Sequence, residues 1–296
     1  MAASSSSSSV IPGFISHATP TRTLSPLSYN RRQHFPSSPY QKKTRGIVGS
    51  TKISAKLGQK TALEYRKLGD SDLVISEITL GTVTFRQQNT EKEAHDILNY
   101  AFENGINILD TSEAVIVATK VCGYSEQSSY IRENAKVLRV DAANIRESVE
   151  KSPQRLGTDY IDLLQIRWPD RYVPLFGEFF YDPSKWRPSV PFVEQLIAFK
   201  ELIDQGKVRY IGVSNETSYG VMEFVHAAKD KGLPKIVSIQ NCYSLLLRCK
   251  FEIDLVKVCH PNNCNIGLLA YSPLAGGSLT GKYFDIDSEA AKKRKT

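Results

Sequence analysis

Short apolar runs alternate with amphipathic helical patterns along most of the chain. One run ends near Gly81, two lie within Ile106–Val121, and four more lie at Tyr160–Ile166, Val208–Val213, Ile236–Gln240 and Leu268–Tyr271. A short continuous apolar run is typical of a strand that is buried on both faces of a parallel sheet. Seven such strands, joined by single helices, predict a parallel sheet with helices packed outside it.

Turn and capping residues mark the other elements. Two short strands around Gly69–Asp72 predict an N-terminal hairpin, and Thr90 with Glu93 predicts a capping box that starts a helix. An apolar stripe at helical spacing predicts the buried face of that helix, at Ala94, Ile97, Leu98, Ala101 and Phe102. Further helices are predicted at Ala142–Leu156, from Pro191 to Gln205, at Tyr219–Lys231 and at Phe251–His260.

The length of the patterned region limits the fold. An eight-stranded (β/α) barrel needs about 250 residues, and residues 61–296 supply 236. The pattern lacks one helix after Asp110 and the last strand–helix pair beyond Lys282. We therefore predict an α/β fold, an incomplete TIM (β/α)8 barrel with an N-terminal hairpin, without the helix after the second strand and without the last strand–helix region.

The segment Ile106–Val121 contains two apolar runs, the first ending in Asp110-Thr111 and the second in Thr119-Lys120. Only residues 112–114 separate these runs, and three residues span at most about 11 Å. A parallel pair needs a crossover of about a dozen residues or more. The sequence therefore predicts that the two strands do not pair in parallel register. They would form an antiparallel hairpin, merge into one strand, or leave one strand outside the barrel.

The positive charge of the chain belongs to its N-terminal part. The net charge is +7, but residues 1–60 hold nine basic residues and no acidic one, which leaves 29 basic against 31 acidic residues in 61–296. A slightly acidic domain does not favour a nucleic-acid partner. No apolar run approaches the roughly 20 residues of a membrane helix. The cysteines are scattered without a Cys-x-x-Cys pair, so we predict neither disulfides nor a metal site.

The N-terminal part has the composition of an organelle transit peptide, with many serines, basic residues and no acids. Its five prolines would interrupt a long amphipathic helix, which favours a plastid address in the chloroplast stroma over a mitochondrial one. An ordinary disordered N-terminus of a cytoplasmic protein is the alternative. We predict a disordered transit peptide at 1–58 and a partial barrel domain at 59–296.

Polar residues lie where the predicted strands end, at Asp110, Lys120, Arg167, Ser214, Asn215, Gln240 and Tyr271. In a parallel barrel the reactive groups gather at these C-terminal ends. Each residue also has a structural explanation, such as helix capping, loop hydrogen bonding or rim packing. Their recurrence at successive strand ends favours one shared site over seven separate structural roles.

Several motifs, in order, resemble the aldo/keto reductases. They are Tyr65-Arg66-Lys67-Leu68-Gly69, Leu80-Gly81-Thr82, Gly105 to Thr111, Ala118-Thr119-Lys120, Leu156 to Leu163, Gly206 to Asn215, and Tyr271-Ser272-Pro273-Leu274. The likeness covers about residues 63–283 and is greatest to the bacterial and plant branch that includes reductases similar to potassium-channel β-subunits.

The resemblance implies a (β/α) barrel that binds NADPH and transfers a hydride to the carbonyl carbon of an aldehyde or ketone, giving an alcohol. In the family a Tyr hydroxyl protonates the carbonyl oxygen, a Lys–Asp ion pair lowers the pKa of that Tyr, and a His orients the substrate. The matching ion pair here is Asp110 and Lys120. The matching cofactor residues are Ser214, Asn215, Gln240, Tyr271, Ser272, Leu274, Gly276, Ser278, Leu279 and Lys282.

The chain departs from the family pattern at the catalytic acid. No tyrosine lies within a few residues after Asp110-Thr111, where the family has its catalytic Tyr, and the position of the family His is Arg167, which stays charged and cannot act as a neutral donor. We therefore expect an internally deleted and C-terminally shortened form of an NADPH-dependent reductase, with little or no activity. The alternatives are a non-catalytic nucleotide-binding or regulatory subunit and a truncated product without function. The sequence predicts neither the particular carbonyl substrate nor the oligomeric state.

Overall fold

The computed structural model describes residues 63–284, with gaps at 83–84, 86–88, 111–115, 127–136, 157, 176 and 179. The chain divides between Ile53 and Ser54, and every described residue belongs to the second unit. The predicted transit peptide at 1–58 therefore lies outside the described residues.

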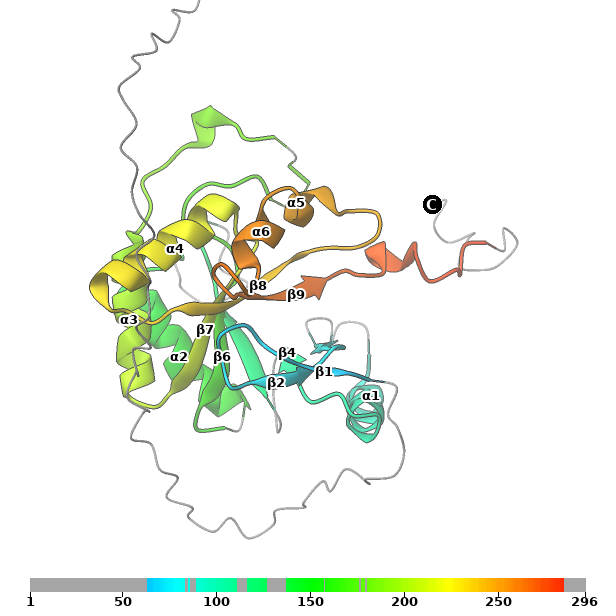
Figure 1. The fold of residues 1–296 in the computed structure, drawn as a ribbon. Helices are drawn as coiled ribbons and strands as arrows, with labels where there is room; N and C mark the ends of the chain where they lie inside the picture. Colours follow the sequence, from blue (N-terminus) through cyan, green and yellow to red (C-terminus); the bar gives the residue numbers. More distant parts are fainter. Residues whose placement is uncertain are drawn as a thin grey trace, which may run out of the picture. The chain divides into compact units, whose positions relative to one another are not determined.

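Seven parallel strands form one curled sheet in the described part of the chain (Figure 1). They lie side by side in sequence order: β3 (Leu80–Gly81), β4 (Leu109–Asp110), β5 (Val117–Val121), β6 (Ile161–Ile166), β7 (Val208–Ser214), β8 (Ile236–Cys242) and β9 (Gly267–Tyr271). Every pairing between neighbours is parallel. With β3 and β9 as the two edges, the sheet is an incomplete barrel, which confirms the predicted fold class.

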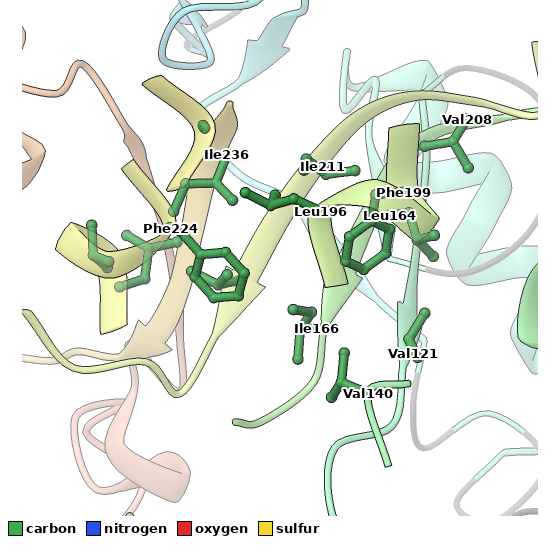
Figure 2. Packing of buried hydrophobic residues seen from close by; sticks show 14 of the residues in the cluster. Val121, Val140, Leu164, Ile166, Leu196, Phe199, Val208, Ile211, Phe224 and Ile236 are labelled. Carbon is green, nitrogen blue, oxygen red and sulfur yellow. The ribbon is translucent and has the colours of Figure 1, made fainter. Parts of the chain in front are cut away.

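Helices cover the outer face of the sheet. They are α2 (Ala142–Leu156), α3 (Phe192–Asp204), α4 (Ser218–Lys231), the short α5 (Cys249–Glu252) and α6 (Leu255–Cys259). Figure 2 shows how Leu164 and Ile166 of β6 pack with Leu196 and Phe199 of α3. All four side chains are almost completely buried, and burial of one such side chain contributes roughly 1.5–3 kcal/mol. This outer layer is the larger of the two hydrophobic clusters.

The N-terminal hairpin covers the inner face of the sheet. Its strands, β1 (Tyr65–Lys67) and β2 (Val74–Ser76), pair antiparallel as predicted. Leu68 and Ile75 of this segment pack against Leu163 of β6 and Val237 of β8. In Figure 1 the hairpin lies on the opposite side of β6 and β7 from α2 and α3. Leu163 and Leu164 therefore face different cores, as the two-residue period of a strand requires.

Gly69 allows the hairpin to approach the sheet this closely. It has a φ of +52°, and a Cβ at this position would lie 2.2 Å from the Val237 carbonyl oxygen. Only glycine combines a left-handed backbone with so little space. The hairpin turn is therefore built against the starts of β8 and β9.

The pairing of β4 with β5 contradicts the prediction made from their short link. Leu109 pairs with Val117 and Asp110 with Ala118, and both pairs are parallel. The prediction assumed that the chain must return along a full strand, but the β4 ladder is only two residues long. The six residues 111–116 can span up to about 20 Å, which is enough to return by one residue and cross one strand spacing. A helical crossover is not required for a ladder this short.

Helix α1 (Glu91–Glu103) begins as predicted but is less buried than predicted. The Thr90 hydroxyl accepts from the Glu93 backbone N–H, and the Glu93 carboxylate accepts from the Thr90 backbone N–H, which confirms the capping box. Of the apolar stripe, however, only Ala101 is buried, and Ile97 is 37% exposed. The two strands that α1 connects are each two residues long, so they offer little sheet surface for a helix to cover.

Two further predicted elements differ from the structure. The single helix predicted at Phe251–His260 is instead α5 followed by α6, because Asp254 between them has a φ of −139°, outside the helical region. The first sheet strand, predicted as buried, is an edge strand in which Leu80 is half-buried and Gly81 is exposed. In the described ranges no helix has the length and apolar character needed to cross a membrane.

Candidate active site

The centre of the candidate site is an ion pair between two neighbouring strands. Asp110 ends β4, and Lys120 lies one residue before the end of β5. The Lys120 Nζ lies 2.5 Å from each carboxylate oxygen of Asp110, and the two side chains are only 16% and 11% exposed. Burial lowers the pKa of Lys120, Asp110 acts to raise it, and the charge of Arg167 lowers it further. The net direction is downward, so burial and Arg167 together outweigh the carboxylate.

Lys120 lies on the inner face of its strand. Ala118, two residues earlier, belongs to the inner core, and residues two apart share a face. Its register partner on β6 is Gln165, which is completely buried. Neither carboxamide atom of Gln165 has a hydrogen-bond partner among the described residues, and the same holds for the Ser238 hydroxyl. A polar layer therefore lies above the apolar inner core, toward the carboxyl ends of the strands.

Arg167 follows β6 and occupies the position where the family pattern has a histidine. It is exposed, and its guanidinium carbon lies 5.3 Å from the centre of the Trp168 ring. Its backbone carbonyl accepts a hydrogen bond from the Asn215 side chain at 2.9 Å. The guanidinium supplies a permanent positive charge near Lys120 and no neutral proton donor.

A second group of polar residues lies at the ends of β7, β8 and β9. Ser214 and Gln240 are register partners, and the backbone N–H of Asn215 donates to the Gln240 carbonyl at 3.0 Å. The Asn215 amide donates to the Ser214 hydroxyl at 3.2 Å, and the Tyr271 hydroxyl donates to the Asn215 side-chain oxygen at 2.7 Å. Burial raises the pKa of Tyr271, so its hydroxyl is a donor at neutral pH. The structure thus brings together all four residues that the sequence placed at these strand ends.

Glu216, the residue after Asn215, forms a salt bridge that the sequence did not predict. Arg171 makes a bidentate ion pair with Glu216, whose side chain is buried. The Glu216 backbone also exchanges two hydrogen bonds with the Asn241 side chain. Asn215 has a φ of +54°, a conformation that Asn tolerates better than most residues. The sequence contained no spacing signal for this pair, because the two residues lie on different loops.

The remaining predicted cofactor residues lie in one loop after β9. They are Ser272, Leu274, Gly276, Ser278, Leu279 and Lys282. The loop contains a short 3-10 helix, Ala275–Gly277, and closes on itself through a hydrogen bond from the Leu279 N–H to the Leu274 carbonyl at 3.1 Å. The Lys282 ammonium folds back to within 2.9 Å of the position that a Cβ of Gly277 would take. Lys282 thus lies against the glycine turn of the same loop.

Tyr271 lines two cavities at the site. The larger, about 760 Å³, extends along β9 and is lined by Asp110, Gln240 and Tyr271 as well as by hairpin residues. The smaller, about 350 Å³, is lined by Asn215, Cys242 and Tyr271. Both volumes fall in the range of small-molecule sites. Asp110 is therefore reached from the larger cavity.

Tyr124 is a candidate replacement for the missing tyrosine acid, but the structure places it elsewhere. Its hydroxyl donates to Glu126 at 2.6 Å, and this carboxylate raises the pKa of Tyr124. The Arg187 guanidinium stacks over its ring at 3.8 Å, and both residues line a separate cavity. Among the described residues the Lys120 ammonium donates to Asp110 and to no tyrosine.

The chain belongs to the aldo/keto reductase family. The model of the "Aldo/keto reductase family" matches residues 77–296. The chain is 40% identical over 256 residues to Protein tas of Escherichia coli (strain K12), which covers 75% of this chain and 71% of that protein. It is 46% identical over 178 residues to an aldo-keto reductase of Babesia bovis, covering 58% of this chain and 62% of that protein. The family consists of oxidoreductases that use NAD(P)H.

Proposed function

We propose that the chain binds NADP(H) and accepts a small aldehyde or ketone, but reduces it at a low rate. The observation that carries the proposal is the Asp110–Lys120 ion pair, which lies at the strand ends without a tyrosine hydroxyl bonded to it among the described residues. The pair marks a site for carbonyl chemistry. The described residues place no tyrosine beside this pair to act as the general acid that protonates the carbonyl oxygen.

The residues beside this pair fit a nicotinamide cofactor. A carboxamide presents one acceptor and two donors, and Ser214, Asn215 and Gln240 offer groups of both kinds within one cluster. The Tyr271 ring is suited to stack on a planar heterocycle, and Lys282 with the turn at Gly276 would hold the pyrophosphate. When bound, the cofactor would supply the hydride. The protein residues would orient it and exclude water.

The reductase rate tests the proposal. Loss of a general acid costs on the order of 10²–10⁴ in rate. We expect NADPH to quench the intrinsic fluorescence of the protein on binding. NADPH oxidation with a simple aldehyde should be slower by that factor than oxidation by an active aldo/keto reductase under the same conditions. Turnover at a normal enzymic rate would contradict the proposed impairment, and absence of quenching would contradict cofactor binding.

A second candidate function is nucleotide binding without catalysis, as in a regulatory subunit. Arg167 favours it, because a permanently charged side chain replaces the residue that orients the substrate in the family. This candidate predicts tight NADPH binding with no detectable turnover. A product without function is the third candidate, and a cooperative thermal melt of the 61–296 segment would count against it.

We also propose the plastid stroma as the location, on the composition of residues 1–60, which are basic, free of acids and rich in serine. A fusion of residues 1–58 to a fluorescent protein should accumulate in plastids. Accumulation in mitochondria or in the cytoplasm would overturn this location. A fusion with the basic residues of the same segment changed to glutamine is the matched control and should remain cytoplasmic.

A further inference from the structure

The lysine at the centre of the site has three features that favour a reactive amine. Its side chain is largely buried, it faces the carboxylate of Asp110, and that carboxylate lines a cavity of small-molecule size. A lysine that is desolvated and placed beside another cation is the type of amine that attacks carbonyl compounds. We propose that Lys120 forms a reversible imine with small aldehydes, independently of any nucleotide cofactor.

The geometry around Lys120 supplies both a proton acceptor and access. Each oxygen of Asp110 lies 2.5 Å from the Lys120 Nζ, so one carboxylate can take a proton from the ammonium without rearrangement. Asp110 also lines the cavity of about 760 Å³. A small aldehyde bound at the Asp110 end of that cavity would therefore lie beside the carboxylate that holds the amine.

The reaction balances with these two residues and the aldehyde alone. The ammonium gives one proton to Asp110, and the free amine adds to the carbonyl carbon. A second proton moves from the nitrogen to the oxygen, which gives a carbinolamine. Asp110 then returns its proton to the hydroxyl, which leaves as water, and the carbon–nitrogen double bond forms as a protonated imine. Asp110 ends as a carboxylate, and no oxidant or reductant is consumed.

Arg167 makes the Lys120 amine more reactive by lowering its pKa. Its charge and the burial of Lys120 both lower the pKa of the lysine, which raises the fraction of free amine at neutral pH. Arg167 is exposed and stacks on Trp168, so it can be replaced without opening the core. It is a positioning and electrostatic residue in this reaction, because it acts through Lys120.

The chain contains an internal control for the burial effect. Lys92 pairs with Asp96 at 3.0 Å, as Lys120 pairs with Asp110, but the Lys92 side chain is 86% exposed. Both lysines have an aspartate partner, and they differ in burial and in the nearby arginine. If the reactivity of a lysine depended only on its having an aspartate partner, Lys92 and Lys120 would react with the aldehyde at the same rate.

The test is reductive trapping followed by peptide mapping. The full chain is incubated with butanal and sodium cyanoborohydride, without nucleotide, and the initial rates of alkylation at Lys120 and Lys92 are compared. We expect Lys120 to react at least about tenfold faster, because burial and Arg167 lower its pKa and leave more of the amine unprotonated. A ratio below about ten would overturn the proposal. The wild-type protein alone decides this, so no variant needs to fold.

A second arm tests the role of Arg167. Arg167→Gln removes the charge and should slow alkylation of Lys120 several-fold while leaving Lys92 unchanged. Arg167→Lys keeps the charge and should keep the rate. Equal rates in Arg167→Gln and the wild type would overturn the assigned role of Arg167. NADPH binding is measured by fluorescence on the same samples, so a failure of the imine proposal and a failure of cofactor binding are seen separately.

Discussion

The Lys120 Nζ lies 2.5 Å from the Asp110 carboxylate, and the two residues lie on neighbouring parallel strands that are joined by only six residues, 111–116. The sequence had argued against this arrangement, because a parallel pair usually needs a helical crossover. The two-residue length of β4 removes that requirement. The ion pair between Asp110 and Lys120 therefore forms although only six residues join the two strands.

The ion pair itself should be strongly coupled. Lys120→Met leaves Asp110 buried without its partner, and breaking one side of a buried pair costs about 3–5 kcal/mol in the free energy of unfolding. The double variant Asp110→Asn with Lys120→Met should recover much of that loss, because no unpaired charge remains. Urea unfolding of the four proteins in the cycle measures the coupling. Additive losses in the double variant would contradict a direct interaction.

Asp170 should make the fold sensitive to acid. Its fully buried side chain accepts hydrogen bonds from Arg139 and from the backbone N–H groups of Val140 and Val190. These hydrogen bonds overcome burial and hold the pKa of Asp170 below its ordinary value of 3.8. A carboxyl group whose pKa is lower in the folded state than in the unfolded state stabilises the fold at pH values above its unfolded-state pKa. That stabilisation is lost as the pH falls below 3.8 and through the pKa of Asp170 in the folded state.

The matching measurement compares the wild type with Asp170→Asn. The variant should be less stable by about 2–4 kcal/mol at neutral pH, since it loses a charged acceptor of several buried donors. The difference in the free energy of urea unfolding should shrink as the pH is lowered below 3.8. A difference that stays constant to the lowest accessible pH would show that Asp170 does not titrate with folding.

Gly69 should tolerate no side chain. Gly69→Ala forces a Cβ to 2.2 Å from the Val237 carbonyl oxygen at a positive φ, so the hairpin must move away from the sheet. Gly232→Ala is the matched control, because Gly232 has a φ of +61° and open space around its Cβ position. The control should lose about 1 kcal/mol, the cost of the backbone conformation alone. Gly69→Ala should lose at least about twice as much in thermal or urea unfolding, and similar losses would refute the packing argument.

Tyr271 should contribute its ring rather than its hydroxyl to cofactor affinity. Tyr271→Ala removes the surface proposed to stack on the nicotinamide, and we expect NADPH to bind about tenfold more weakly, equivalent to about 1.4 kcal/mol. Tyr271→Phe keeps the ring and loses only the hydrogen bond to Asn215, so it should bind nearly as well as the wild type. Fluorescence titration measures both. Equal loss in the two variants would assign the effect to the hydroxyl instead.

The sequence was informative where local chemistry decides the structure. The capping box at Thr90, the hairpin turn at Gly69 and the strand ends at Asp110 and Tyr271 were all predicted, because each depends on residues close together in the chain. The burial of α1 was overestimated, since an apolar stripe does not reveal how much sheet lies beneath it. The break at Asp254 was missed because the helical pattern continues across it.

The sequence by itself determined the family, the succession of strands and helices along the chain and the identity of the polar residues at the strand ends, since these depend on residue type and spacing. Only the tertiary structure decided that β4 and β5 pair in parallel. It also decided that Arg171 and Glu216 support Asn215, and that Gln165 is buried in the barrel without a partner among the described residues. Each of these depends on contacts between segments distant in the chain, whose distances a periodic pattern does not encode.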